Sequence, residues 1–183
     1  VTNCYSTLVF TNQEKTMKTI TTFLITTFLL CTSVSAAELN LPMHKVSKDG
    51  KSGQLIGMIN LKDTRYGLLI TPDVHHLKTG FHGFHVHAKD SCADNGMAAG
   101  GHFDPMHTGQ HLGPYNDKGH LGDLPRLYVN ESGDAIVPML APRLTLEKIR
   151  HHALMIHADG DNYSDLPKKL GGGGARVACS VIK

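Results

Sequence analysis

From residue 38 onward the chain is built from short segments in which apolar and polar residues alternate, with turn-forming sequences such as Asp49-Gly50 and Thr79-Gly80 between them. Alternation with a period of two is typical of β-strands that bury one face, and a helical turn fits only Leu144–Arg150. Short strands without long helices between them predict an all-β, antiparallel sandwich or barrel. The eight strands that we expect are Glu38–Val46, Gly53–Leu61, Gly67–Thr71, Gly83–Ala88, Arg126–Val129, Ala135–Leu140, Ala153–His157 and Arg176–Ile182.

Two long connections interrupt this pattern, from Lys89 to Leu124 and from Asp159 to Ala175. Connections of this length in a compact domain are usually functional or disordered. The second ends in Gly171–Gly174, directly before the last expected strand. A flexible linker is one interpretation, but the place of this glycine run between two buried strands favours a backbone that packs closely against another part of the fold.

The first 36 residues have the pattern of a leader. Met17-Lys18 is followed by the apolar run Ile20–Leu30 and then by small residues that end at Ala36-Ala37. This order is typical of a secretory signal peptide, and the run is too short and too rich in threonine to span a membrane. We expect residues 1–36 to be an upstream extension plus signal peptide, with the start at Met17 and cleavage after Ala36, or alternatively after Ala37. Residues 37–183 would then form a single domain.

Charge and cysteine content narrow the possible partners and the compartment. The sequence has 18 Lys and Arg against 16 Asp and Glu, a net charge of +2 with neutral histidines. Such a balance argues against nucleic acid or an anionic membrane as a partner. Cleavage of the leader leaves Cys92 and Cys179 as the two cysteines, and in an exported protein such a pair predicts one disulfide. Two free buried thiols are the alternative.

The thirteen histidines are the strongest chemical signal, and all lie beyond residue 36. His85 and His87 are two residues apart in an expected strand, so they project from the same face about 7 Å apart. Phe84 and Val86 can then enter the core. Two imidazoles placed in this way can converge on one metal ion. For this pair alone, two exposed histidines on a polar strand face explain the pattern equally well.

The first long connection adds four further candidate ligands. His102, His111 and His120 follow one another with eight residues between successive members, and Asp123 comes three residues later. Three imidazoles and one carboxylate from a single loop can form a closed tetrahedral zinc site. Because such a site leaves no open coordination position, we expect its role to be structural.

Six stretches are together highly specific for one family: GFHVHAKDSC (Gly83–Cys92), GGHFDP (Gly100–Pro105), GHLGDLP (Gly119–Pro125), LAPRLTL (Leu140–Leu146), LMIHADGDNYSD (Leu154–Asp165) and LGGGGARVACSVIK (Leu170–Lys183). Through them the chain resembles the copper/zinc superoxide dismutases of the bacterial, periplasmic type, from about Glu38 to Lys183. The resemblance implies an eight-stranded antiparallel Greek-key β-sandwich or barrel with two long functional loops. It also implies a periplasmic enzyme that converts superoxide into dioxygen and hydrogen peroxide while copper cycles between Cu(II) and Cu(I).

The resemblance also implies a role for each matching residue. Asp161 would link a copper ligand to a zinc ligand and fix the orientation of both rings. Arg176, three residues before Cys179, would attract and orient the anionic substrate, with a surface salt bridge as the alternative. His102 would bridge the two ions and take up a proton during the reaction. The implied ligands of one copper and one zinc per subunit are His85, His87, His102 and His157 for copper, and His102, His111, His120 and Asp123 for zinc.

A periplasmic protein that buffers or delivers copper and zinc on the same fold is the main alternative function. A copper carrier is expected to use soft methionine or cysteine ligands, whereas the methionines here are scattered and both cysteines fit a disulfide. A zinc hydrolase is weaker still, because no glutamate lies beside the histidines as a general base.

The segment between Cys92 and Gly100 is shorter than in many bacterial relatives, where it helps dimer contact, so we expect either a monomer or a homodimer.

Overall fold

The computed structural model describes residues 36–183, and β-strands account for most of the regular structure in this range. All pairings among these strands are antiparallel. Residues 1–35, which make up all but the last residue of the predicted leader, lie outside the described range. The nine strands are β1 (Glu38–Lys45), β2 (Leu55–Thr64), β3 (Gly67–Val74), β4 (Gly80–His82), β5 (Phe84–His87), β6 (Leu127–Val129), β7 (Met139–Ala141), β8 (His152–His157) and β9 (Arg176–Ile182).

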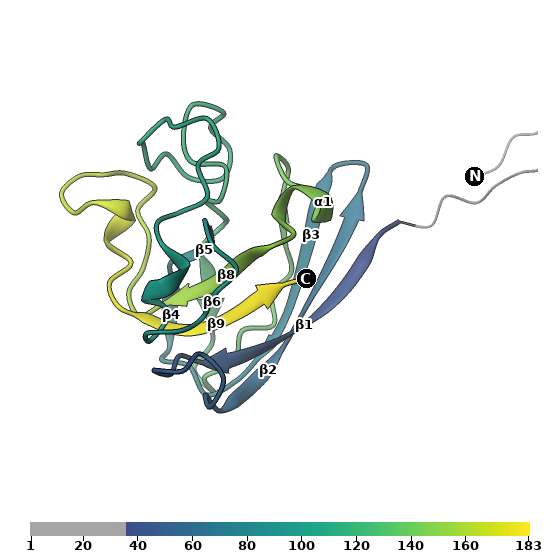
Figure 1. Cartoon of the computed structure of the whole chain (residues 1–183), viewed down its shortest axis with the longest axis vertical. Helices are drawn as coiled ribbons and strands as arrows, with labels where there is room; N and C mark the ends of the chain where they lie inside the picture. Colours follow the sequence, from purple (N-terminus) through teal and green to yellow (C-terminus); the bar gives the residue numbers. More distant parts are fainter. Residues whose placement is uncertain (1–35) are drawn as a thin grey trace, which may run out of the picture. The chain divides into compact units, whose positions relative to one another are not determined.

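Seven of these strands form one sheet in the order β5-β8-β9-β1-β2-β3-β7, and β4 and β6 form a second, two-stranded sheet. Figure 1 shows the large sheet strongly curled, with β5, β8 and β9 turned away from the plane of β1, β2 and β3. The neighbours β5-β8 and β3-β7 are far apart in sequence, so long crossovers connect them, as in Greek-key folds. The predicted all-β, antiparallel class is confirmed.

One strand, β4, was not expected, which is why residues 36–183 contain nine strands rather than eight; the expected strand Gly83–Ala88 is present as β5. β4 pairs with β6, whereas β5 pairs with β8, and the chain changes partner at Gly83. There the N–H of Gly83 donates to the carbonyl of Asp159 at 2.7 Å, and its own carbonyl accepts from the N–H of His157 at 2.8 Å. The turn signal at Thr79-Gly80 concealed the three-residue strand that begins at Gly80.

The remaining elements are short. The expected strand Ala135–Leu140 is present only as β7 and an isolated bridge between Ala135 and Val74. The predicted helical turn is α1 (Leu146–Ile149), and two 3₁₀ turns, η1 (Met97–Ala99) and η2 (Leu170–Gly172), lie within the long connections. Within residues 36–183, no helix is long and apolar enough to span a membrane.

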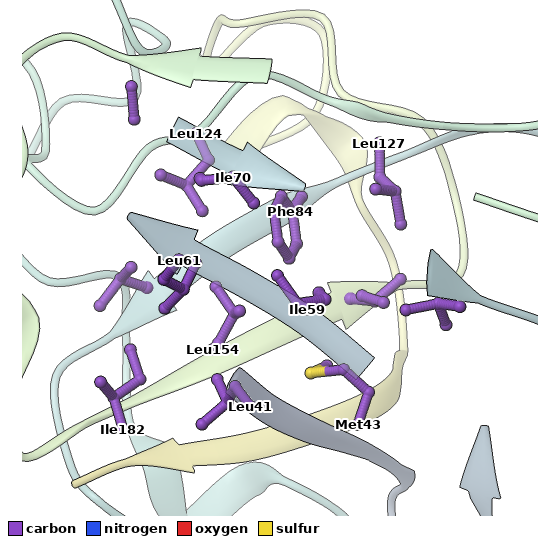
Figure 2. Packing of buried hydrophobic residues seen from close by; sticks show 14 of the residues in the cluster. Leu41, Met43, Ile59, Leu61, Ile70, Phe84, Leu124, Leu127, Leu154 and Ile182 are labelled. Atoms are coloured by element: carbon purple, nitrogen blue, oxygen red, sulfur yellow. The ribbon is translucent and has the colours of Figure 1, made fainter. Parts of the chain in front are cut away.

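The alternating pattern places one face of each long strand in a common hydrophobic core. Leu41 of β1, Ile59 and Leu61 of β2, Phe84 of β5 and Leu154 of β8 are almost fully buried in this cluster and are labelled in Figure 2. Burial of each such side chain contributes about 1.5–3 kcal/mol. Because Phe84 is fixed in the core, the neighbouring positions of β5 are held at defined places on the opposite face.

Both long connections are folded against each other. The first runs from residue 88 to 126 and the second from 158 to 175, and in Figure 1 both project from the same side of the curled sheet. The N–H of His111 donates to Asp165 Oδ2 at 2.9 Å, and the N–H of Arg126 donates to the hydroxyl of Tyr163 at 3.0 Å. Gly113 also packs so closely on the ring of Tyr163 that a Cβ at this position would lie 2.8 Å from it.

Candidate metal centre

β5 supplies the first two histidines of the centre. His85 and His87 alternate with Phe84 and Val86, as the strand period requires, and the latter two lie in the core. His85 and His87 have no exposed surface, and their ring centroids are 6.3 Å apart. The interpretation of two exposed histidines on a polar strand face is therefore wrong.

Two further histidines join this pair from other segments. His102 lies in the first long connection, bridged to β5 by a β-bridge with His87, and His157 is the last residue of β8. The Nε2 atoms of His87 and His157 are 3.2 Å apart, and the ring of His102 stacks on that of His85 at 3.9 Å. One nitrogen from each of these four buried residues lies within 4.8 Å of those of the other three. Such a set of four imidazoles suits a copper ion.

A second cluster is centred on Asp123 and shares His102 with the first. Asp123 Oδ1 accepts from Nδ1 of His102 at 2.9 Å and lies 3.4 Å from Nδ1 of His120, while Oδ2 lies 3.0 Å from Nδ1 of His111. Ligand atoms of His85, His102, His111 and Asp123 all lie within 4.8 Å of one another, so His85 as well as His102 belongs to both groups, whereas His120 is outside this set and approaches Asp123 at 3.4 Å. Three imidazoles around one carboxylate form the donor set of a structural zinc site.

Four buried polar atoms in these clusters have no hydrogen-bond partner among the described residues, namely Nδ1 of His85, His111 and His120, and Oδ2 of Asp123. His111 Nδ1 and Asp123 Oδ2 are close, but they are not aligned as donor and acceptor. An unpartnered buried polar atom costs about 1–3 kcal/mol, and four in one place are unusual. Cations bound between them would supply the missing partners, so the residues fit one copper and one zinc.

Asp161 lies between the two clusters. Its Oδ2 accepts from Nε2 of His85 at 2.7 Å and its Oδ1 from Nε2 of His111 at 2.8 Å. Both rings therefore carry a proton on Nε2, so Nδ1 is the nitrogen of each ring that can bind a metal. Burial raises the pKa of Asp161, but the hydrogen bonds from His111 and His85 outweigh burial and hold the pKa below its ordinary value. Gly171 (φ 68°) passes directly beside this carboxylate, where a Cβ would lie 1.9 Å from Oδ1.

Burial has a uniform effect on three histidines of the first cluster. It lowers the pKa of His85 to about 3, that of His87 to about 2 and that of His157 to about 4. These rings are therefore neutral at physiological pH, as a metal ligand must be. His111 behaves differently. Burial lowers its pKa, but the nearby carboxylates of Asp123 and Asp161 together raise the pKa to about 9, so in the metal-free protein Nδ1 is protonated as well and a metal at this ring has to displace that proton.

A cavity of about 220 Å³ opens onto the first cluster and is lined by His87, His102, His157, Lys169 and Arg176, among others. The guanidinium of Arg176 is held in place by donating to the carbonyl oxygens of Gly96 and Gly100. No carboxylate pairs with Arg176 within residues 36–183. Its charge is thus directed at the cavity rather than neutralised by a surface salt bridge.

The predicted disulfide between Cys92 and Cys179 is present. It connects the beginning of the first long connection to β9, three residues after Arg176. The pattern of ligands was visible in the sequence, whereas Lys169 was not singled out by it. The prediction that the run Gly171–Gly174 packs closely against another part of the fold is confirmed, because a Cβ at Gly171 would lie 1.9 Å from Asp161 Oδ1 and one at Gly174 would lie 2.3 Å from Asp159 Oδ2.

The comparisons with known proteins agree with this geometry. The family model described as "Copper/zinc superoxide dismutase (SODC)" matches residues 55–182. "Superoxide dismutase [Cu-Zn]" of Photobacterium leiognathi is 52% identical over 143 residues, which cover 74% of this chain and 83% of that protein. The solved structure "Cu/Zn superoxide dismutase from Brucella abortus" is similar with a TM-score of 0.75 and 42% identity, covering 80% of this chain and all of that one. A solution structure of the "Monomeric Copper, Zinc Superoxide Dismutase from Salmonella enterica" is similar with a TM-score of 0.71 and 49% identity. The match covers 80% of this chain and 100% of that one.

Proposed function

This chain belongs to the copper/zinc superoxide dismutase family, and on that premise we propose a role for each residue of the centre. The protein is a superoxide dismutase whose cofactors are copper and zinc. The observation that carries the assignment is the position of His102, which belongs to both groups and, unlike His85, directs a ring nitrogen at Asp123. The copper ligands are His85, His87, His102 and His157, and the zinc ligands are His102, His111, His120 and Asp123.

Copper, when bound, supplies one-electron redox chemistry, and zinc supplies a fixed charge that orders the loop. The protein contributes the geometry. Asp161 keeps the proton of His85 and His111 on Nε2, so that Nδ1 of each ring faces its ion. His102 directs Nδ1 to Asp123 in the zinc cluster, so Nε2 is the nitrogen left for the copper cluster; whenever Nε2 is not a ligand, it can hold a proton and pass it to a reduced oxygen species. Overall, two superoxide ions and two protons give one dioxygen and one hydrogen peroxide.

Arg176 binds and orients the substrate anion. Its guanidinium lines the cavity together with His87 and His157, and two main-chain carbonyl groups fix its position. A fixed cation in a narrow, partly buried opening raises the local concentration of a small anion and accelerates its association. Lys169 lines the same cavity and adds to this positive field.

The compartment and the assembly are part of the same proposal. The leader-like sequence before residue 37 and the disulfide support export to the periplasm. All candidate ligands come from a single chain, so the site is complete in one subunit whether the protein is a monomer or a homodimer. The Salmonella enterica structure is described as monomeric, which supports an active monomer here.

Replacement of Arg176 by Gln tests the substrate role against the alternative of a metal-buffering protein. The metal-loaded parent should consume superoxide catalytically, with a rate that falls as ionic strength rises. We expect R176Q to lower the rate at low ionic strength about tenfold or more and to weaken its salt dependence, while copper and zinc contents stay unchanged. R65Q is the matched control, because Arg65 lies over the exposed ring of Tyr66 and should leave the rate unaltered.

Two results would contradict the proposal. A parent that holds stoichiometric copper without consuming superoxide would indicate metal buffering. An R176Q variant with the full rate and the full salt dependence would remove Arg176 from the substrate path.

A further inference from the structure

The guanidinium of Arg143 lies against the part of the first long connection that carries His111 and His120. Its Nε donates to the carbonyl of Pro114 at 2.9 Å and its Nη1 to that of Gly119 at 3.3 Å. Its Nη2 donates to the carbonyl groups of Gly113 at 3.2 Å and His120 at 2.6 Å. Four hydrogen bonds from one side chain, which has five N–H groups, therefore end on main-chain oxygens of residues 113–120.

Arg143 itself projects from a firmly anchored segment. It follows β7, which pairs with β3, and the neighbouring Leu144, Leu146 and Ile149 are almost fully buried in the core. The N–H of Leu146 donates to Asp63 Oδ1 at 2.8 Å. The guanidinium thus connects the loop to the hydrophobic core.

Apart from Arg143, this part of the loop is held by the second long connection, through the N–H of His111 on Asp165 and the packing of Gly113 on Tyr163. None of residues 104–120 belongs to the hydrophobic core. The N–H of His120 donates to the carbonyl of Gln110 at 2.9 Å, which closes residues 110–120 into a ring and brings His111 and His120 together. The contacts with the second long connection are made at His111 and Gly113, so Arg143 is the side chain that bonds the carbonyl groups of Gly119 and His120 at the other end of the ring.

We propose that Arg143 is a positioning residue for the zinc site, which fixes the separation of His111 and His120 by holding the carbonyl groups between them. This inference rests on the proposed assignment of both histidines to zinc. The planar guanidinium spans four acceptors at once, which the point charge of a lysine cannot do. Arg143 contacts no candidate ligand atom, so it acts through the backbone of the loop.

The effect should be selective for zinc. His85, His87 and His157 are placed by β5 and β8, whose pairing involves no residue of the loop. Loss of the guanidinium should therefore loosen the zinc ligands and leave most of the copper ligands in position.

Arg143→Gln tests this prediction. We expect the zinc dissociation constant, measured by competition with a chelator, to rise about 10–100-fold, as is usual when a group that orients metal ligands is removed. The copper dissociation constant should change little. In the metal-free protein, hydrogen exchange of the amides in residues 110–120 should be faster than in the parent. Arg150→Gln is the matched control, because Arg150 follows α1 in the same segment but contacts the carbonyl of Lys183 and the carboxylate of Glu147, and not the loop.

Arg143→Lys, which keeps the charge and the aliphatic stem, should also weaken zinc binding, and it provides the measurement if the Gln variant does not fold. Unchanged zinc affinity, or an equal loss of zinc and copper, would overturn the inference. His120→Ala is measured in parallel. If it retains the zinc affinity of the parent, the assignment of the ligands is at fault rather than the role of Arg143.

Discussion

Asp161 is the residue through which the two histidine clusters depend on each other. One carboxylate accepts from His85 on the copper side and from His111 on the zinc side, and it also accepts the main-chain N–H of Tyr163. Displacement of this side chain would release both rings at once. Gly171 protects the arrangement, because any side chain at that position would overlap Oδ1.

At the scale of single residues, metal ligands are easier to recognise in the sequence than the residues that hold those ligands in position. His85, His87, His102 and the later ligands could be recognised because metal binding requires particular side chains at particular spacing. Arg143 acts through bonds to main-chain oxygens 23–30 positions earlier, and Gly171 leaves room for the side chain of Asp161. The glycine run predicted close packing, but neither partner could be named, because both contacts depend on how the chain returns on itself.

At the scale of elements, the disulfide and the first long connection act as one unit. Cys92 begins the segment whose carbonyl groups, at Gly96 and Gly100, hold Arg176, and Cys179 lies three residues beyond that arginine in β9.

The alternation of apolar and polar residues identified most strands in the sequence, because each of these strands buries one face in the core. It failed for β4, which has three residues, and for most of Ala135–Leu140, where only a bridge and β7 form.

Cys92→Ser should destabilise the protein and loosen this unit. The bridge closes a loop of 87 residues, so we expect the free energy of unfolding to fall by about 4–5 kcal/mol on the chain-entropy argument. Hydrogen exchange of residues 92–100 should become faster. Thermal or urea unfolding measures the first effect, and reduction of the parent by a thiol should reproduce both. A variant that unfolds at the parent's midpoint would show that the bridge does not stabilise the fold.

At the scale of the whole molecule, the buried histidines make the stability of the metal-free protein depend on pH. The pKa values of His85, His87 and His157 are about 3, about 2 and about 4, against about 6.5 in an unfolded chain. Between about pH 6.5 and pH 4 the unfolded chain therefore binds protons that the folded chain does not. His111, with a pKa of about 9, acts in the opposite direction, since its contribution is lost as the pH rises from about 6.5 to 9.

We therefore expect the metal-free protein to be most stable near pH 6.5. The free energy of unfolding should fall by up to roughly 4 kcal/mol per pH unit on the acid side, and less steeply on the alkaline side. Urea unfolding at several pH values, with the disulfide intact, measures this profile. Stability that increases from about pH 6.5 toward pH 5 would be inconsistent with three buried neutral histidines.

We propose that two adjacent ions share His102 and are otherwise held by separate ligands. The most direct measurement is the copper and zinc content of His157→Ala and His120→Ala, with His107→Ala as an exposed control in the same loop. The parent and the control should bind one ion of each metal per chain. His157→Ala should lose copper and keep zinc, and His120→Ala should lose zinc and keep most of its copper. If each variant retained both metals, or if both variants lost the same metal, the division of the centre into these two sites would be wrong.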